Sequence, residues 1–191
     1  QLCNLADEIA YNAHDIDDGV RSGLLSMEQL VEVPLFDRHR CEALKAHPSL
    51  GGRRLLFESI RLMLSNQVYD VLFTTRDRIR ASGVGSVDDV RLLREPLVAF
   101  SDDMAMASRQ LKRFLFQNLY RHPQVMETTQ RASRVVHELF DLYLERPEQC
   151  PAIVVPSRVS PARAVADYIA GMTDRFAIRE HQRLSGQTLF P

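Results

Sequence analysis

The spacing of hydrophobic residues is helical in almost every long segment of the chain. Apolar side chains recur at intervals of three and four residues, which places them on one face of a helix. This pattern predicts helices from about Arg53 to Ala81, from about Ser101 to Tyr120, from Pro123 to about Arg146, and onward from about Ser160. One short apolar run between prolines, 152–155, is the exception. We therefore expect an all-α fold with no sheet larger than a minor hairpin.

These helical faces also predict which residues are buried, and they carry enough apolar residues to form a sizeable core. The predicted core residues are Leu56, Ile60, Met63, Gln67, Val68, Val71 and Leu72, then Met104, Ala107, Leu111, Phe114, Leu115 and Leu119, then Val125, Thr129, Ala132, Val136, Leu139 and Tyr143, and finally Val165, Tyr168, Ile169 and Met172. Serine and proline mark several helix starts, since Ser82 or Ser86 could cap the segment that begins near residue 87 and Ser160-Pro161 opens the last one.

A different pattern occupies the first helical stretch, from about residue 5 to Gly19. One side of it is apolar and carries Leu2, Leu5, Ile9, Ala13 and Ile16. The other side carries Asp7, Tyr11, His14, Asp15 and Asp18. Acidic groups gathered without basic neighbours repel one another unless a metal ion or a hydrogen-bond donor on a substrate offsets them. No lysine or arginine precedes Arg21, so this face is a candidate binding site.

The overall composition bears on the class of partner and on the cellular compartment. Lys plus Arg is 24 and Asp plus Glu is 25, so no overall charge marks a nucleic-acid or membrane binder. Arginine suits bidentate phosphate recognition, although its excess over Lys45 and Lys112 also fits a simple compositional bias. The 3 cysteines are widely spaced, which indicates neither a zinc site nor a disulfide framework and favours a reducing cytoplasm.

Three separated motifs, in this order, carry a resemblance to a known family. The first is Ala-Asp-Glu-Ile-Ala-Tyr-Asn-Ala-His-Asp-Ile-Asp-Asp over 6–18, the second is formed by 111–115 and 118–122, and the third is 166–176. Together they resemble the HD-domain deoxynucleoside triphosphate triphosphohydrolases, the bacterial dGTPase-like enzymes. The resemblance implies an HD-domain-type helical bundle, of which this chain would be the C-terminal portion.

The resemblance also implies roles for individual residues and for ligands. Asp7 matches the last ligand of a His, His-Asp, Asp metal site, where a divalent ion such as Mn or Mg would bind. Tyr11 and Asp15 match positions that face the nucleotide, with Asp15 on the sugar 3′-hydroxyl. The implied reaction converts a deoxynucleoside triphosphate, dGTP by preference, to a deoxynucleoside and tripolyphosphate. The family forms homo-oligomers.

The start of the chain suggests that a part of the protein is missing. Gln1 replaces a starting Met, and no capping sequence precedes the apolar periodicity. In the family the other metal ligands lie upstream, so we expect this chain to be inactive alone and to pair with a missing N-terminal part. Its expected divisions are 1–25 as the end of the metal-site motif, 26–146 as a helical body, 147–160 as a stiff proline-rich connection and 161–191 as a C-terminal helical segment.

Arg53 and Arg54 follow two glycines at the start of the long predicted helix. An anion near a helix start interacts favourably with free amides, and arginine adds charge-assisted hydrogen bonds. These two arginines are therefore candidates for binding the triphosphate, although a simple surface position is the favoured interpretation.

Each residue of the acidic face has a structural alternative. Asp7 could be a surface carboxylate, Tyr11 a half-buried aromatic, and Asp15 the partner of Arg21 in a salt bridge. His14 is expected to make a structural hydrogen bond.

Further along, the structural interpretations come first. Asp17 and Asp18 could simply end the helix before Gly19, a candidate C-terminal glycine. The basic pairs 112–113 and 121–122 are expected on an exposed face or at a subunit contact, and 174–175 in an ion pair. For the whole protein, another HD phosphohydrolase activity or a non-enzymatic helical interaction module are the alternatives.

Overall fold

The computed structural model describes residues 1–151 and 159–190, and within them the protein is helical with no β-strand. The all-α prediction is therefore confirmed. The apolar run 152–155 and most of the predicted proline-rich connection lie outside the described residues. The chain forms two compact units, Gln1–His122 and Pro123–Pro191, which we describe separately.

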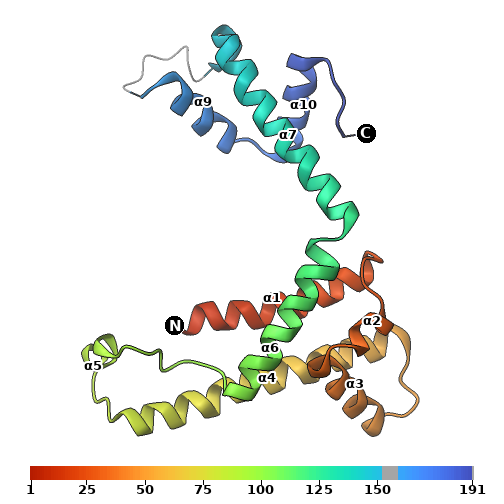
Figure 1. Ribbon diagram of the computed structural model, residues 1–191, viewed down its shortest axis with the longest axis vertical. Coiled ribbons are helices and arrows are strands. Elements are labelled where there is room, and N and C mark those ends of the chain that lie inside the picture. The colour runs from red at the N-terminus through yellow and green to blue at the C-terminus, as the bar shows by residue number, and fades with distance from the viewer. Residues whose placement is uncertain (152–158, 191) are drawn as a thin grey trace. The chain divides into compact units, whose positions relative to one another are not determined.

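The first unit is built around one long helix (Figure 1). Its elements are α1 (Leu2–Arg21), α2 (Met27–Val31), α3 (Pro34–Ala46), α4 (Gly52–Ser82), α5 (Val87–Leu92), α6 (Asp102–Leu115) and a π-helical turn (Phe116–Tyr120). Helix α1 packs on α4 and on α6, and α3 packs on the same two helices. The long helix predicted from Arg53 to Ala81 is thus confirmed, as is the helical segment predicted from Ser101 to Tyr120.

Local sequence explains where these helices start and stop. Gly83 ends α4 in a left-handed conformation, with φ of 67°, which glycine adopts without a steric penalty. Ser86 and Asp89 form a capping box at α5, and the Ser101 hydroxyl accepts a hydrogen bond from the Met104 amide at the start of α6. Asp70 of α4 accepts hydrogen bonds from the Ser101 amide, at 2.8 Å, and from its hydroxyl, at 2.6 Å. This carboxylate therefore ties the start of α6 to the middle of α4.

The first unit has its own hydrophobic core. The buried side chains of that core are Ile9, Ile16, Leu25, Leu30, Val33, Leu35, Phe36, Leu56, Met63, Val71, Phe100, Met104, Leu111, Leu115 and Leu119. Most of the predicted core positions on α4 and α6 are buried or half-buried, but Val68 and Leu72 are exposed. Those two residues face an apolar groove beside α1 rather than the interior.

The second unit packs two short helices against a long one. Helix α7 (Pro123–Glu145) contacts α9 (Pro161–Ala170) and α10 (Asp174–Ser185), and a 3₁₀ turn (Pro147–Gln149) follows α7. Ser160 caps α9 and Pro161 occupies its first turn, as the sequence predicts. The buried core side chains here are Val135, Leu139, Tyr143, Cys150, Val165 and Leu184. The hydroxyl of Tyr143 donates to Glu180 at 2.8 Å, which satisfies the polar end of this buried ring.

Two sequence predictions about helices are wrong in detail. Helix α1 does not end before Gly19 but continues to Arg21, and Gly23 takes the left-handed conformation, with φ of 75°. Gly19 is instead buried, where an added Cβ would lie 2.6 Å from a methyl carbon of Leu25. The small size of this glycine serves packing, not helix termination.

The predicted core of the third helix is also displaced. Leu139 and Tyr143 are buried, but Val135 is buried in place of Val136, which is 47% exposed. Thr129 and Ala132 are exposed, because the side chains that α7 buries all lie in its second half. The sequence analysis treats 26–146 as one helical body, and it does not place the boundary that the structure shows after His122.

Candidate functional site

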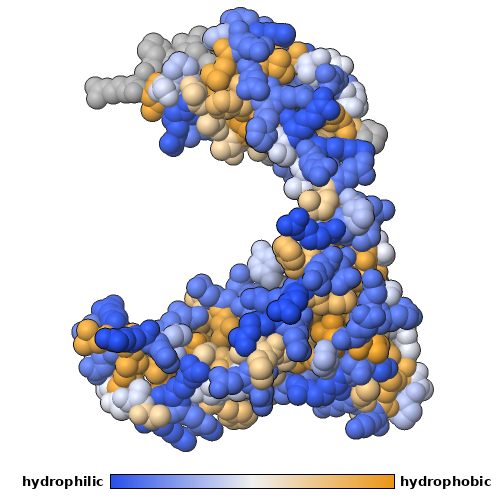
Figure 2. Space-filling model, viewed as in Figure 1, coloured by the Kyte–Doolittle hydropathy of each residue, from blue (hydrophilic) through white to orange (hydrophobic). Residues whose placement is uncertain are grey.

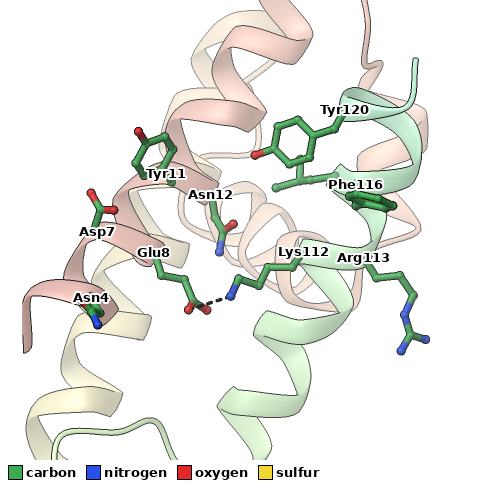
Figure 3. Close-up of a pocket in the computed structure, with 10 residues that line it drawn as sticks. Asn4, Asp7, Glu8, Tyr11, Asn12, Lys112, Arg113, Phe116 and Tyr120 are labelled. Carbon is green, nitrogen blue, oxygen red and sulfur yellow. Dashed lines mark ion pairs between the residues drawn. The ribbon is translucent and has the colours of Figure 1, made fainter. Parts of the chain in front are cut away.

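A hollow with a volume of about 540 Å³ lies between α1 and α6 of the first unit (Figure 3). Helix α1 contributes the side chains of one wall, and α6 with its π-helical turn contributes the other. The lining residues are Asn4, Asp7, Glu8, Tyr11, Asn12, Lys112, Arg113, Leu115, Phe116 and Tyr120. Carboxylates, cations, two carboxamides and three aromatic rings therefore surround one open space.

The acidic face predicted for the first helix is present on α1. Asp7 and Tyr11 line the hollow and Asp15 is bonded to Tyr120, which also lines it. Asp7 is exposed and makes no hydrogen bond or ion pair with the residues that the structure describes. The Tyr11 ring is 62% exposed. His14 and Asp18 are exposed as well.

Tyr120 reaches α1 from the π-helical turn that ends the α6 segment. In this turn the amide of Arg121 bonds to the carbonyl of Phe116, five residues earlier in the chain. Single π-helical turns are frequent at functional sites. The Tyr120 hydroxyl donates a hydrogen bond to Oδ2 of Asp15, which leaves the other carboxylate oxygen of Asp15 for another donor. Burial of the hydroxyl and this hydrogen bond to Asp15 raise the pKa of Tyr120 to about 12.

Lys112 joins the two walls of the hollow through Glu8. Its ammonium lies 2.8 Å from Oε2 of Glu8, and the hydroxyl of Ser108 donates to Oε1 of Glu8 at 3.2 Å. Both oxygens of Glu8 are therefore engaged. Arg113, in the next position, makes no ion pair within the described part of the chain, and it lines the same hollow. Among the charged side chains that line this hollow, Arg113 and Asp7 are therefore the two without an ion-pair partner in the described part of the chain.

The described residues do not form a complete metal site. Nowhere among them do three or more histidines, cysteines or carboxylates gather as metal ligands do. Asp7 offers oxygen, the donor that hard divalent cations prefer. Glu8, its neighbour, is held by Lys112. The chain therefore fits the role of contributing Asp7 as one ligand, and further ligands have to come from elsewhere.

The structure does not bring Arg53 and Arg54 to this hollow. Arg53 lines a separate hollow of about 360 Å³ with residues such as Asp17 and Leu56, and its guanidinium lies over the ring of Phe57, 5.0 Å from the ring centroid. Arg54 is exposed. Their role in binding the triphosphate stays a prediction, without support from the geometry of the first hollow.

Two structural alternatives are also decided by the contacts. Arg21 pairs with Asp17 at 2.7 Å, so the alternative in which it pairs with Asp15 is wrong. In the second unit neither Asp174 nor Arg175 forms an ion pair with a described residue, and Asp174 instead stands in the first turn of α10. The basic pair at Lys112 and Arg113 is exposed as predicted, but it also lines the hollow, which the sequence analysis did not foresee.

Sequence reasoning missed several lining residues, chiefly Glu8, Asn12, Phe116 and Tyr120. Glu8 and Asn12 lie one turn apart on α1, between the apolar and acidic faces that the sequence pattern separates. Phe116 and Tyr120 are four residues apart, and such a pair in an amphipathic helix is ordinarily assigned to the core. The sequence offered one signal for Tyr120, because this residue belongs to 118–122, the last part of the second motif.

Comparison with known proteins shows which proteins this chain resembles. Residues 98–183 match the family described as "Phosphohydrolase-associated domain". A "Deoxyguanosinetriphosphate triphosphohydrolase-like protein" of Ralstonia nicotianae is 50% identical over 185 residues, 96% of this chain and 48% of the relative. This chain is a relative of the deoxyguanosinetriphosphate triphosphohydrolase-like proteins. The resemblance drawn from the three motifs is therefore confirmed.

Other triphosphohydrolase-like relatives show the same extent of similarity. The protein of that name from Bordetella pertussis is 49% identical over 187 residues, and the one from Caulobacter vibrioides is 44% identical over 189 residues. In each case 96% of this chain and 48% of the relative are covered. The chain thus spans about half the length of the curated relatives that it matches. Among its described helices, none combines the length and the apolar character that a membrane crossing requires.

Proposed function

We propose that the full-length protein hydrolyses deoxynucleoside triphosphates, with dGTP as the preferred substrate, to deoxynucleoside and tripolyphosphate. The observation that carries the proposal is the shared hollow. Asp7 and Tyr11 lie in its α1 wall and Lys112 and Tyr120 in its α6 wall, in a chain related over 96% of its length to triphosphohydrolase-like proteins. Deoxynucleoside triphosphates are cytoplasmic metabolites, so we place the reaction in the cytoplasm.

Different side chains in and beside the hollow suit different parts of such a substrate. Asp15 is held by Tyr120 through one oxygen, so its second oxygen is positioned to accept a hydrogen bond from the sugar 3′-hydroxyl. The exposed rings of Tyr11, Phe116 and Tyr120 offer flat apolar surface for the sugar and the base. Lys112 and Arg113 offer positive charge for the phosphates.

Asp7 is the residue that we propose to hold a divalent ion, Mn or Mg, together with ligands from another part of the protein. When bound, the ion would supply Lewis-acid polarisation at the α-phosphate. Positive side chains near the leaving group favour the charge that develops on tripolyphosphate. Because Asp7 is the one such ligand in this site, we expect the chain 1–191 to have negligible activity by itself.

An apolar groove on the first unit supports the need for a further part. Leu2, Val68, Leu72 and Ile79 are exposed between 39% and 59%, and they line two adjoining hollows along α1 and α4 with almost no polar surface. Figure 2 shows hydrophobic side chains reaching the surface of this unit. We propose that the remainder of the full-length protein covers this groove, and that homo-oligomers form from the complete subunit.

Product analysis with the full-length protein tests the proposed function. The expected products from dGTP are deoxyguanosine and tripolyphosphate, with loss of turnover and of bound metal in parallel in Asp7→Asn. Release of single phosphates would favour another HD phosphohydrolase. No turnover with any deoxynucleotide, in a metal-loaded protein that binds a partner helix, would favour an interaction module.

A further inference from the structure

Asn12 is a buried polar residue whose side-chain donor has no acceptor. Its side chain is 5% exposed, and its Nδ2 atom makes no hydrogen bond with the residues that the structure describes. Leaving a buried amide unpaired costs folding free energy, so such groups are rare and call for an explanation. Asn12 also lines the hollow between α1 and α6. A donor kept at that cost in the wall of a hollow indicates a ligand that accepts from it.

The surroundings of Asn12 show which chemical group would accept. Figure 3 shows its amide nitrogen directed toward the side of the hollow where Glu8 and Lys112 meet. The Glu8 carboxylate accepts from Lys112 at 2.8 Å and from Ser108 at 3.2 Å, and it makes no hydrogen bond with Asn12. Asn12 and Lys112 line the same hollow, and the amide of one and the ammonium of the other are both hydrogen-bond donors. An oxygen that is anionic and only accepts suits both of them.

We propose that Asn12 donates a hydrogen bond to a phosphate oxygen of the bound nucleotide, beside Lys112. This inference rests on the proposed function, and it adds a binding residue that neither the sequence motifs nor the comparisons assign. Asp15 lies in the part of α1 that follows Asn12, and Tyr120 of the π-helical turn is bonded to it. The Asn12 carboxamide therefore separates the proposed sugar-binding carboxylate from the cationic end of the hollow. Asn12 therefore contributes to phosphate binding rather than to sugar recognition.

The proposal predicts opposite effects on stability and on binding. In Asn12→Leu the unpaired amide is replaced by an apolar group of similar size, so thermal unfolding should occur at the same temperature or higher. Affinity for a non-hydrolysable deoxynucleoside triphosphate and for inorganic tripolyphosphate should fall about tenfold or more, the scale of a hydrogen bond to a charged acceptor. Affinity for the deoxynucleoside alone should not change.

Gln67 provides the matched control. It is fully buried in the same unit, and both amide atoms of its side chain lack partners among the described residues. It does not line the hollow. Gln67→Met should therefore raise or preserve stability as Asn12→Leu does, while tripolyphosphate affinity remains that of the wild type.

The experiment is calorimetric titration of the full-length protein and its variants with tripolyphosphate, the triphosphate analogue and the deoxynucleoside. Asn12→Asp, which keeps the shape but places a carboxylate beside the phosphate, should bind tripolyphosphate even more weakly than Asn12→Leu. Wild-type affinity in both variants, or an equal loss for deoxynucleoside and tripolyphosphate, would overturn the proposal. If wild-type protein hydrolyses no deoxynucleotide, the proposed function fails, and the tripolyphosphate titration still decides the role of Asn12.

Discussion

At the scale of single residues, the hydrogen bond from Tyr120 to Asp15 fixes the position of one carboxylate beside the hollow. The phenol holds one carboxylate oxygen in place and leaves the other free. A carboxylate fixed in this way recognises a hydroxyl donor with little loss of side-chain freedom on binding. Asp7 contrasts with it, since its carboxylate is exposed and makes no hydrogen bond or ion pair with the described residues.

The first prediction concerns the proposed role of Asp15 in sugar recognition. In the full-length protein, Asp15→Asn should retain its metal and lose about ten- to a hundredfold in kcat/KM on a deoxynucleoside triphosphate, because a hydrogen bond to a charged acceptor is lost. The 2′,3′-dideoxy analogue lacks the donor, so its kcat/KM should change little. Equal losses of kcat/KM on the two substrates would show that Asp15 does not contact the sugar and has a structural role instead.

The second prediction concerns the titration of Tyr120. Its pKa of about 12 lies above the ordinary value of 10.0, mainly because its hydroxyl is partly buried. A raised pKa in the folded state means that the contribution to stability is complete below pH 10 and is lost as the pH rises toward 12. The tyrosinate absorbance of wild type minus that of Tyr120→Phe should therefore titrate near pH 12. A midpoint near 10 would show that Tyr120 is not held as described, and Asp15→Asn should move the midpoint downward.

At the scale of the elements, helices could be predicted from sequence where periodicity and capping agree. The bounds of α4 and the starts of α5 and α9 follow from Gly83, Ser86 and Ser160, which act through local backbone chemistry. The π-helical turn at 116–120 has no such local signal, because an amphipathic α-helix and its π-helical end have similar patterns. The candidate site was accordingly predictable only in part. The sequence shows Asp7 and Tyr11 of the α1 wall but not Glu8 and Asn12, and the place of Phe116 and Tyr120 in the other wall depends on that turn.

The third prediction tests the link between α4 and the start of α6. Asp70→Ala removes the acceptor of two hydrogen bonds from Ser101, so it should lower the free energy of unfolding by about 2 kcal/mol. Urea denaturation measures this change. Asp77→Ala is the control, since Asp77 is 61% exposed, pairs only with its neighbour Arg76, and should show no measurable effect. Similar losses in both variants would contradict a specific role for Asp70.

At the scale of the whole molecule, two hydrophobic cores lie on either side of residue 122. Periodicity predicted most of the buried positions in the first core and half of those in the second. It did not predict that the cores are separate, since a helical pattern does not state which helices share a core. Val135 and Val136 illustrate this limit, because both fit the apolar spacing of α7 and only the packing of α9 and α10 selects Val135.

The fourth prediction is that each core can be weakened by itself. Leu111 and Leu139 are both fully buried, one in each unit. Leu139→Ala should cost about 2–5 kcal/mol and speed hydrogen exchange in α9 and α10, while exchange in α1 and α4 stays as in the wild type. Leu111→Ala should have a similar cost in free energy and should speed hydrogen exchange in α1 and α4, while exchange in α9 and α10 stays as in the wild type. Faster exchange throughout the chain in either variant would show that the two cores unfold as one.

The central claim is that the hollow between α1 and α6 holds the nucleotide. A crystal structure of the full-length protein with a non-hydrolysable deoxynucleoside triphosphate and a divalent ion tests this most directly. We predict the sugar beside Asp15, the phosphates beside Lys112 and the ion on Asp7. A nucleotide bound elsewhere, such as in the hollow that Arg53 lines with Asp17, would contradict the account.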